Sequence, residues 1–506
     1  MAGPTLSELS AVAAGATDPG IASARLPKPG GVDPLGLRQI NFDLLDLVFP
    51  DVNNVARHIR PFVLIAWAWR RAGQLAEKTG GTDVKVENLR DFVARMEVLF
   101  VWSQFLRNPA VDLPGGQFLE PLIRGDGYVF GGPAWATMRE ARRMSTALSA
   151  PINYGPASRS LGWVQPHPER ADVMIASPVV AAALDAFEVG IAPFLDHPAF
   201  SEFDSVEVSA AEVRLWAEGW ALDRPSEAER SAAAESLQGQ TSSPQRRAGV
   251  KLMLDVIGQS ASTDVASLRR SMCGRPTNFA PAEDVGATLE AWRKVQVRQA
   301  FRLALEGLLF WVTTQLSGAP RSTGSLVDAF LTAAPDRSGA PAARQWIGPD
   351  ETWGVGPTDV MDAIERAFRN PGQEGLPTAI VEALRFCLVE APEAGETFER
   401  RDRLPLFRAR SECEAWGDRM PAEFMKHILE SWVLAQHVYW SIGRGLADAR
   451  ASGNTILRLK VTLEEGGWTL TPGATAGGSP NPTPDRLRTI LSLATESGLV
   501  DETKAA

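Results

Sequence analysis

The chain has 506 residues, 44% of them hydrophobic and 22% charged, which allows roughly three or four domains with substantial buried cores. Its formal net charge is −10, from 51 Lys+Arg against 61 Asp+Glu, which excludes a general affinity for nucleic acid. Any DNA contact must therefore come from a local basic patch. The three cysteines, Cys273, Cys387 and Cys413, lie far apart, which excludes a disulfide framework and a Cys-x-x-Cys zinc site and favours a reducing cytoplasm.

The first part of the chain predicts a leader followed by helices. Residues 1–31 are rich in Ala, Gly, Pro and Ser, so we expect a disordered leader rather than a signal peptide. Residues 32–130 predict a helical region, in which the longest apolar run, Phe62–Trp69, is too short for the ~20 residues of a membrane span. Arginines line one side of its first long helix and predict a partner-binding surface, with a solvated charged face as the alternative. These arginines are Arg57, Arg60, Arg70 and Arg71.

Residues 131–205 predict two short helices, a β-hairpin and a closing helix. The first helix starts at Pro133, and its expected buried face is Met138, Ala141, Met144 and Leu148. The second carries Tyr154, Ala157 and Leu161 inward, and Gly162 ends it. A hairpin then turns at residues 166–170, and Ser177-Pro178 starts the closing helix. This order is that of a winged helix-turn-helix module, whose usual ligand is duplex DNA.

The polar residues of this module predict a DNA contact. Arg159 is expected to reach base edges or phosphate, with Ser158 and Ser160 also facing outward, while the other arginines contact phosphate. The candidate DNA-binding residues are Arg139, Arg142, Arg143, Ser158, Arg159 and Arg170. Winged helices also serve as protein-binding modules, and the acids Asp172, Asp185 and Glu188 dilute the basic patch, so protein docking remains the alternative.

The second half predicts a helical body over residues 206–455 and a different ending over 456–506. Ser226 followed by Glu227 and Glu229 suits a helix N-terminus, and 281–316 is the strongest helical segment. Leu457 to Leu463 alternate with polar residues, and a turn at 465–467 leads to a partner strand with Trp468 and Leu470. Overall we expect a mainly α, multi-part helical protein with a winged helix-turn-helix-like module and a C-terminal β-hairpin plus helix.

No catalytic constellation stands out in this sequence. His427 and His437 lie ten residues apart on one predicted helix, about 80° out of phase, so they are not expected to share a metal. Phosphate-binding, zinc-protease and nucleophile-elbow motifs do not occur. Lys460, Glu464 and Glu465 come nearest to a nuclease-like site, but their position at a turn favours a solvated hairpin tip. We therefore expect no catalytic residue, no metal and no cofactor.

Three stretches together resemble a group of known proteins. They are 33–37 with 53–61, the segment 154–162, and 456–459 with 466–468 and 484–487. They resemble uncharacterised bacterial proteins that accompany helicases and nucleases in anti-phage defence gene clusters. The resemblance spans most of the chain and implies an accessory subunit that binds DNA or bridges other subunits, such as a helicase or a nuclease.

Three hypotheses follow for the function. The first is a non-catalytic, cytoplasmic accessory subunit of a bacterial anti-phage defence complex, which binds duplex DNA through the winged module and docks partner proteins. The second is a protein-only scaffold that bridges effector subunits. The third, favoured least, is a metal-dependent nuclease with a dispersed site.

Overall fold

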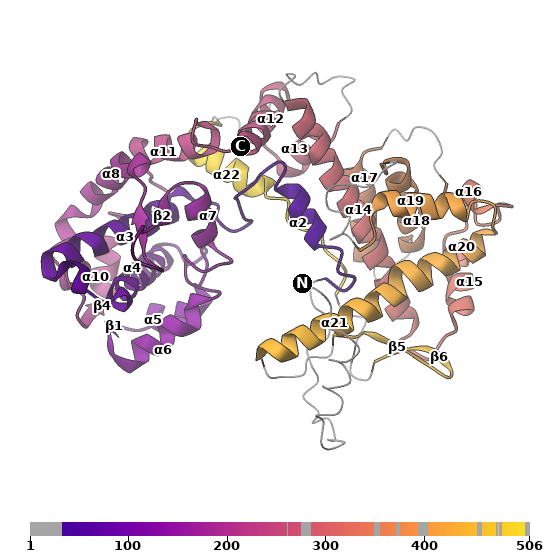
Figure 1. Cartoon of the computed structure of the whole chain (residues 1–506), viewed down its shortest axis with the longest axis horizontal. Coiled ribbons are helices and arrows are strands. Elements are labelled where there is room, and N and C mark those ends of the chain that lie inside the picture. Colours follow the sequence, from indigo (N-terminus) through magenta and orange to yellow (C-terminus); the bar gives the residue numbers. More distant parts are fainter. Residues whose placement is uncertain are drawn as a thin grey trace, which may run out of the picture. The chain divides into compact units, whose positions relative to one another are not determined.

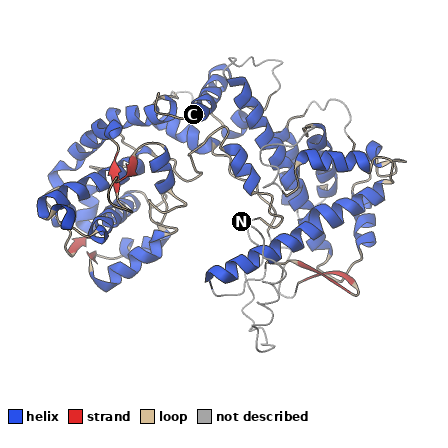
Figure 2. Ribbon diagram, viewed as in Figure 1, coloured by secondary structure: helices blue, strands red, loops and turns tan. Residues whose placement is uncertain are grey.

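The computed structural model describes residues 33–260, 262–274, 285–348, 355–370, 375–392, 403–452, 458–471, 474 and 478–500. The expected leader, 1–31, lies outside these ranges. Helices dominate the described residues, and their strands form three two-stranded antiparallel sheets (Figures 1 and 2), so the prediction of a mainly helical fold is confirmed. None of the described helices combines the length and the apolar character that a bilayer crossing requires.

The chain divides into two compact units. Unit 1 comprises residues 1–44, 273–279 and 290–483, and unit 2 comprises 45–272, 280–289 and 484–506. The division falls inside the stretch 206–455 that the sequence presents as one helical body. Each unit therefore combines segments that are far apart in the sequence.

Unit 2 is built on two long central helices, α3 and α4, which pack against each other. Its elements are α3 (Ile59–Thr79), η1 (Gly81–Asp83), α4 (Val86–Arg107), η2 (Gln117–Leu119), α5 (Glu120–Ile123), β1 (Gly127–Phe130), α6 (Gly132–Arg143), α7 (Tyr154–Ser160), β2 (Val164–Pro166), β3 (Met174–Ala176), η3 (Pro178–Val180), α8 (Ala181–Ile191), η4 (Ala192–Phe194), α9 (Pro198–Ser201), β4 (Val206–Ser209), α10 (Ala210–Trp216), α11 (Glu227–Gln238), α12 (Pro244–Ser260), α13 (Val265–Ser271) and α22 (Leu487–Glu496).

Local sequence explains where several of these helices begin. Ser226 caps α11: its hydroxyl accepts from the N–H of Glu229, whose carboxylate accepts from the N–H of Ser226. This confirms the predicted start. Pro61 lies in the first turn of α3, where its missing N–H would have had no helical partner. Strands β1 and β4 pair from Gly127–Ser209 to Phe130–Val206 and so bracket the segment from α6 to α9.

Unit 1 is organised around α14, a helix of 30 residues. Its elements are α2 (Gln39–Leu45, whose last residue belongs to unit 2), α14 (Gly286–Gln315, which enters unit 1 at Glu290), α15 (Thr323–Ala333), α16 (Ala343–Trp346), α17 (Pro357–Arg369), α18 (Leu376–Val389), α19 (Leu406–Ala415), α20 (Pro421–His427), η6 (Ile428–Leu434), α21 (Ala435–Ser452), β5 (Val461–Glu464) and β6 (Gly467–Leu470). Strands β5 and β6 form a hairpin, with Val461 opposite Leu470.

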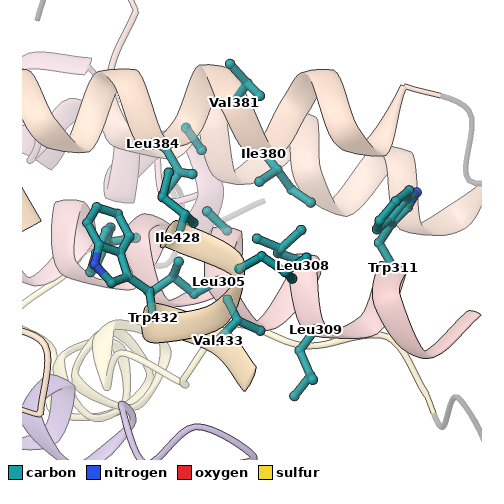
Figure 3. Close-up of a cluster of buried hydrophobic side chains, with 14 of the residues drawn as sticks. Leu305, Leu308, Leu309, Trp311, Ile380, Val381, Leu384, Ile428, Trp432 and Val433 are labelled. Carbon is teal, nitrogen blue, oxygen red and sulfur yellow. The ribbon is translucent and has the colours of Figure 1, made fainter. Parts of the chain in front are cut away.

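The core of unit 1 lies between α14, α18 and η6. Figure 3 shows Leu305 and Leu308 of α14 facing Ile380 and Leu384 of α18, with Trp432 of η6 beside them. All five side chains are at most 2% exposed. The segment η6 is π-helical and joins α20 directly to α21, so that residues 421–452 run as one helix with a widened turn.

Candidate functional site

The segment from α6 to α8 has the predicted order of two helices, an antiparallel hairpin and a third helix. The hairpin pairs Val164 with Ala176, and β3 and α7 both contact α3. Phe62 of α3 packs edge-on against Tyr154, with ring centroids 5.0 Å apart, and stacks on Trp163 at 6.0 Å. As expected, Tyr154 is buried on α7; one face of this short helix is thus attached to the centre of unit 2.

The predicted buried face of α6 is wrong in part: Leu148 is fully buried, but two of the other three predicted residues are exposed. Met144 is 58% exposed and Ala141 is exposed, whereas Trp135 and Arg142 are buried. The indole N–H of Trp135 donates to Asp91 of α4 at 2.6 Å. The helix is therefore rotated from its expected orientation, because the large Trp135 ring takes the inward position and an arginine follows it two turns later.

Two candidate DNA-binding residues are buried. Arg142 is 2% exposed and Ser158 is fully buried. The hydroxyl of Ser158 donates to the carbonyl of Tyr154 one turn earlier, so the expectation that it faces outward is wrong. Burial lowers the pKa of the Arg142 guanidinium, an effect that the buried carboxylate of Glu97 partly offsets. Both residues contribute to packing within unit 2 and are closed to a ligand.

Two further candidates are bound to the neighbouring α4 region. Arg139 forms an ion pair with Asp91 at 3.0 Å. Arg170, in the turn between β2 and β3, donates to the carbonyl of Val84 at 2.5 Å. Both guanidinium groups are half-buried, and each ties its own element to the body of the unit.

The remaining two candidates lie on the surface. Arg143, at the end of α6, is 64% exposed and pairs with Glu140 one turn earlier at 3.0 Å. Arg159 on α7 is exposed, and it has no hydrogen-bond or ion-pair partner within the part of the chain that the structure describes. Of the six candidate DNA-binding residues, only these two arginines are therefore accessible to a ligand.

The four arginines of α3 and its approach do not form one open face. Arg57 pairs with Asp112. Arg60 is 6% exposed, and its Nε lies 3.0 Å from a carboxylate oxygen of the fully buried Glu229. Burial lowers the pKa of Arg60 and raises that of Glu229, as expected for an ion pair removed from water.

Arg70 and Arg71 are likewise engaged within unit 2. Arg70 bridges Asp185 at 2.6 Å and Glu188 at 3.1 Å, both on α8. Arg71 donates from Nε to the carbonyl of Phe200 at 3.1 Å. These contacts hold α8 and α9 against α3, which accounts for these arginines without an external partner.

His437 of α21 is a buried, fully bonded side chain in unit 1. Its Nδ1 lies 2.9 Å from the carbonyl of Pro34, and its Nε2 accepts from the backbone N–H of Lys460 at 2.9 Å. Because Nε2 is an acceptor, the proton of the neutral ring resides on Nδ1 and is donated to Pro34. Burial lowers the pKa of His437 to about 4, helped by the charge of Lys460 and opposed by the bond to Pro34.

The neighbours of His437 on α21 hold the same stretch of chain. Gln436 donates to the carbonyl of Leu35 at 2.7 Å, and the indole of Trp440 donates to the carbonyl of Asp33 at 2.8 Å. Three consecutive carbonyls, of residues 33 to 35, are thus each bound by a side chain of one helix. This arrangement fixes the first described residues onto unit 1.

His427, at the end of α20, lies in a second polar cluster that the sequence did not reveal. Its Nε2 is 2.9 Å from Oε2 of Glu412 on α19, and the indole N–H of Trp432 donates to the same oxygen at 2.6 Å. Nδ1 of His427 is 3.3 Å from the hydroxyl of Ser431. The ring stacks on Trp416, with centroids 4.6 Å apart and planes inclined by 20°.

Glu412 is held as a carboxylate by its three donors. Arg408 donates from Nε to the second carboxylate oxygen at 2.8 Å. Although burial alone would raise the pKa of Glu412, the hydrogen bonds from Trp432, His427 and Arg408 together lower it below its usual range. The only sequence signal for this cluster is the four-residue spacing of His427 and Ser431 on a predicted helix; Glu412 belongs to a different helix.

The other candidate reactive groups are divided between the interior and the surface. The three cysteines are buried, and burial raises the pKa of Cys413 to about 12 and that of Cys387 further. Within the described ranges, no group of three or more His, Cys, Asp or Glu residues is placed to hold a metal ion. At the tip of the β5–β6 hairpin, Glu464 and Glu465 are exposed.

Comparison of the whole sequence and structure with protein-family models, with curated proteins and with solved structures finds no match.

Proposed function

We propose that this chain is a binding subunit that docks another protein through the connection between α6 and α7. The observation that carries the proposal is the pair of apolar side chains exposed there: Met144 is 58% exposed and Ile152 is 61% exposed. Asn153 fixes this connection, because its amide donates to the carbonyls of Ser145 at 3.0 Å and Ala147 at 2.7 Å. Apolar side chains exposed together on one surface segment are typical of protein interfaces.

Two points of context support this choice. The order of elements from α6 to α8 is compatible with a winged helix-turn-helix, a module that serves as a protein-binding as well as a DNA-binding unit. Four of the six candidate DNA-binding residues are engaged inside unit 2, which favours a protein partner. The resemblance to proteins of anti-phage defence clusters suggests that this partner is another subunit of a defence complex, such as a helicase or a nuclease.

Co-purification with the products of neighbouring genes, after nuclease digestion, tests the proposal. We expect a tagged wild-type chain to retain a partner. The affinity of the Met144→Asp/Ile152→Asp variant for that partner should be at least about tenfold lower, equivalent to about 1.4 kcal/mol of binding free energy. Val189→Asp is the matched control, since Val189 is 75% exposed on α8. Equal retention by the double variant and the control would place the interface elsewhere.

DNA binding is a second candidate, which the exposed side chains of Arg159 and Arg143 favour. Binding of a short duplex across a salt series tests it. If both arginines bind phosphate, Arg143→Ala/Arg159→Ala should make the plot of log binding constant against log salt concentration less steep. The slope should fall by about 0.9 for each phosphate that is no longer neutralised. Arg124→Ala is the control, because Arg124 is 77% exposed and lies outside the segment. Absence of wild-type binding at low salt would exclude this candidate for the isolated chain.

A further inference from the structure

The hydroxyl of Ser431 faces a histidine nitrogen that is prepared to accept its proton. The ionised Glu412 accepts the Nε2–H of His427 at 2.9 Å, which leaves the lone pair of the neutral ring on Nδ1. Nδ1 lies 3.3 Å from Oγ of Ser431, an exposed residue. A nucleophile, a base and a carboxylate that orients the base thus follow one another in hydrogen-bonding order, as they do in serine hydrolases, with the roles of the two ring nitrogens exchanged.

The π-helical turn allows Trp432 to share the carboxylate of Glu412 with His427. His427 and Trp432 are five residues apart, which in an α-helix would place them about 140° apart around the axis. In a π-helix, whose hydrogen bonds join residues five apart, such residues lie on the same side of the axis. The turn η6 follows His427 directly and contains Trp432, so both rings reach one oxygen of Glu412. Stacking on Trp416 holds the imidazole plane in place.

We propose that Ser431 is a nucleophilic hydroxyl that reacts with activated acyl esters, with His427 as its general base and Glu412 as the positioning carboxylate. Oγ of Ser431 forms a bond to the acyl carbon while its proton moves to Nδ1 of His427. The bond from that carbon to the leaving alkoxide then breaks, and the alkoxide takes the proton from Nδ1. The products are the acylated Ser431 and a neutral alcohol, and water, activated by His427, later releases the acid.

The surroundings of the three residues favour small, activated substrates. Ser431 is open to solvent, whereas His427 and Glu412 are about four-fifths buried. Arg408, 60% exposed and bound to Glu412 through Nε alone, places a cation beside the cluster. Since the reacting hydroxyl lies on the outer side of a helix, we expect acylation to be easier to detect than turnover.

The experiment is labelling of the full-length chain with a fluorophosphonate probe, followed by peptide mapping, together with the acylation burst from p-nitrophenyl acetate. We expect the label on Ser431, no label in Ser431→Ala, and at least about 100-fold slower labelling in His427→Gln, since a general base contributes at least that factor. Ser411→Ala is the matched control, because Ser411 is an exposed helical serine of α19. Circular dichroism establishes that each variant is folded.

Glu412→Gln separates positioning from a merely structural role. A glutamine amide can donate to Nε2, which allows the tautomer with the proton on Nδ1 and removes the base. We therefore expect a lower maximal acylation rate at an unchanged half-saturating probe concentration. Labelling of His427→Gln at the wild-type rate, or wild-type labelling no faster at Ser431 than at Ser411, would overturn the proposal.

The structure supplies an internal comparison. Ser441 lies 3.3 Å from Nδ1 of His437, at the same four-residue spacing, but that nitrogen donates its proton to Pro34 and Ser441 is 4% exposed. Ser441 should therefore remain unlabelled under the conditions that label Ser431. Equal labelling of the two serines would show that spacing alone, and not the orienting carboxylate, governs the reaction.

Discussion

Acidification should destabilise unit 1 through His437, which is fully buried and bonded at both ring nitrogens. Burial lowers its pKa from 6.5 to about 4, so the unfolded chain binds a proton at a pH where the folded chain does not. Above pH 6.5 the titration of His437 does not lower the free energy of unfolding. Between pH 6.5 and 4 it should remove stability at about 1.4 kcal/mol per pH unit, in total about 3 kcal/mol.

Urea denaturation followed by tryptophan fluorescence, at intervals from pH 7.5 to 4, measures this effect. The informative quantity is the difference in free energy of unfolding between the wild type and His437→Gln, because other titrating groups cancel in it. The free energy of unfolding of the wild type should exceed that of His437→Gln by a constant amount above pH 7, and this difference should shrink steadily as the pH falls below 6.5. A difference that does not change with pH, or that grows on acidification, would show that protonation of His437 does not destabilise unit 1.

Three further predictions concern the stability of unit 2. Arg142→Met removes a buried cation whose charge acts on the buried Glu97 and should lower the free energy of unfolding in urea denaturation by about 1–3 kcal/mol, part of which Glu97→Gln in the same chain should restore. Gly249→Ala should lower the free energy of unfolding by about 2 kcal/mol, since a Cβ there would lie 2.2 Å from the carbonyl of Val48, and an unchanged melting temperature would contradict this close approach. Arg124→Ala should change the free energy of unfolding by less than about 0.5 kcal/mol, because its pair with Glu120 is exposed to solvent; a larger loss in the same assay would contradict that assignment.

Local patterns in the sequence predicted helices well, but not always the face that each helix buries. The capping residues Ser226 and Glu229 and the apolar spacing within 281–316 suffice to locate α11 and α14. On α6 the pattern of methionines favoured the wrong face. The buried Arg142 lies within electrostatic reach of the buried Glu97, a residue of another helix, and no local pattern encodes such a neighbour.

The same limit applies to the candidate sites. An arginine in the sequence signals a positive charge, but whether that charge is open to a ligand depends on distant residues. Arg60 is neutralised by Glu229, more than 160 residues away, whereas Arg159 remains exposed. The cluster around His427 shows the converse: Glu412 and Ser431 are ordinary residues in the sequence, and only the packing of α19 against a π-helical turn joins them.

The π-helical turn also sets the rotational phase of everything that follows it. A single residue adds about 100° around a helix axis, so removal of one residue from η6 would turn α21 by roughly a quarter of a revolution relative to α20. Gln436, His437 and Trp440 would then face away from the carbonyls of residues 33 to 35. The widened turn thus fixes the rotation of α21 relative to α20: the same turn that lets two rings share Glu412 also aligns α21 with the first described residues, 33 to 35.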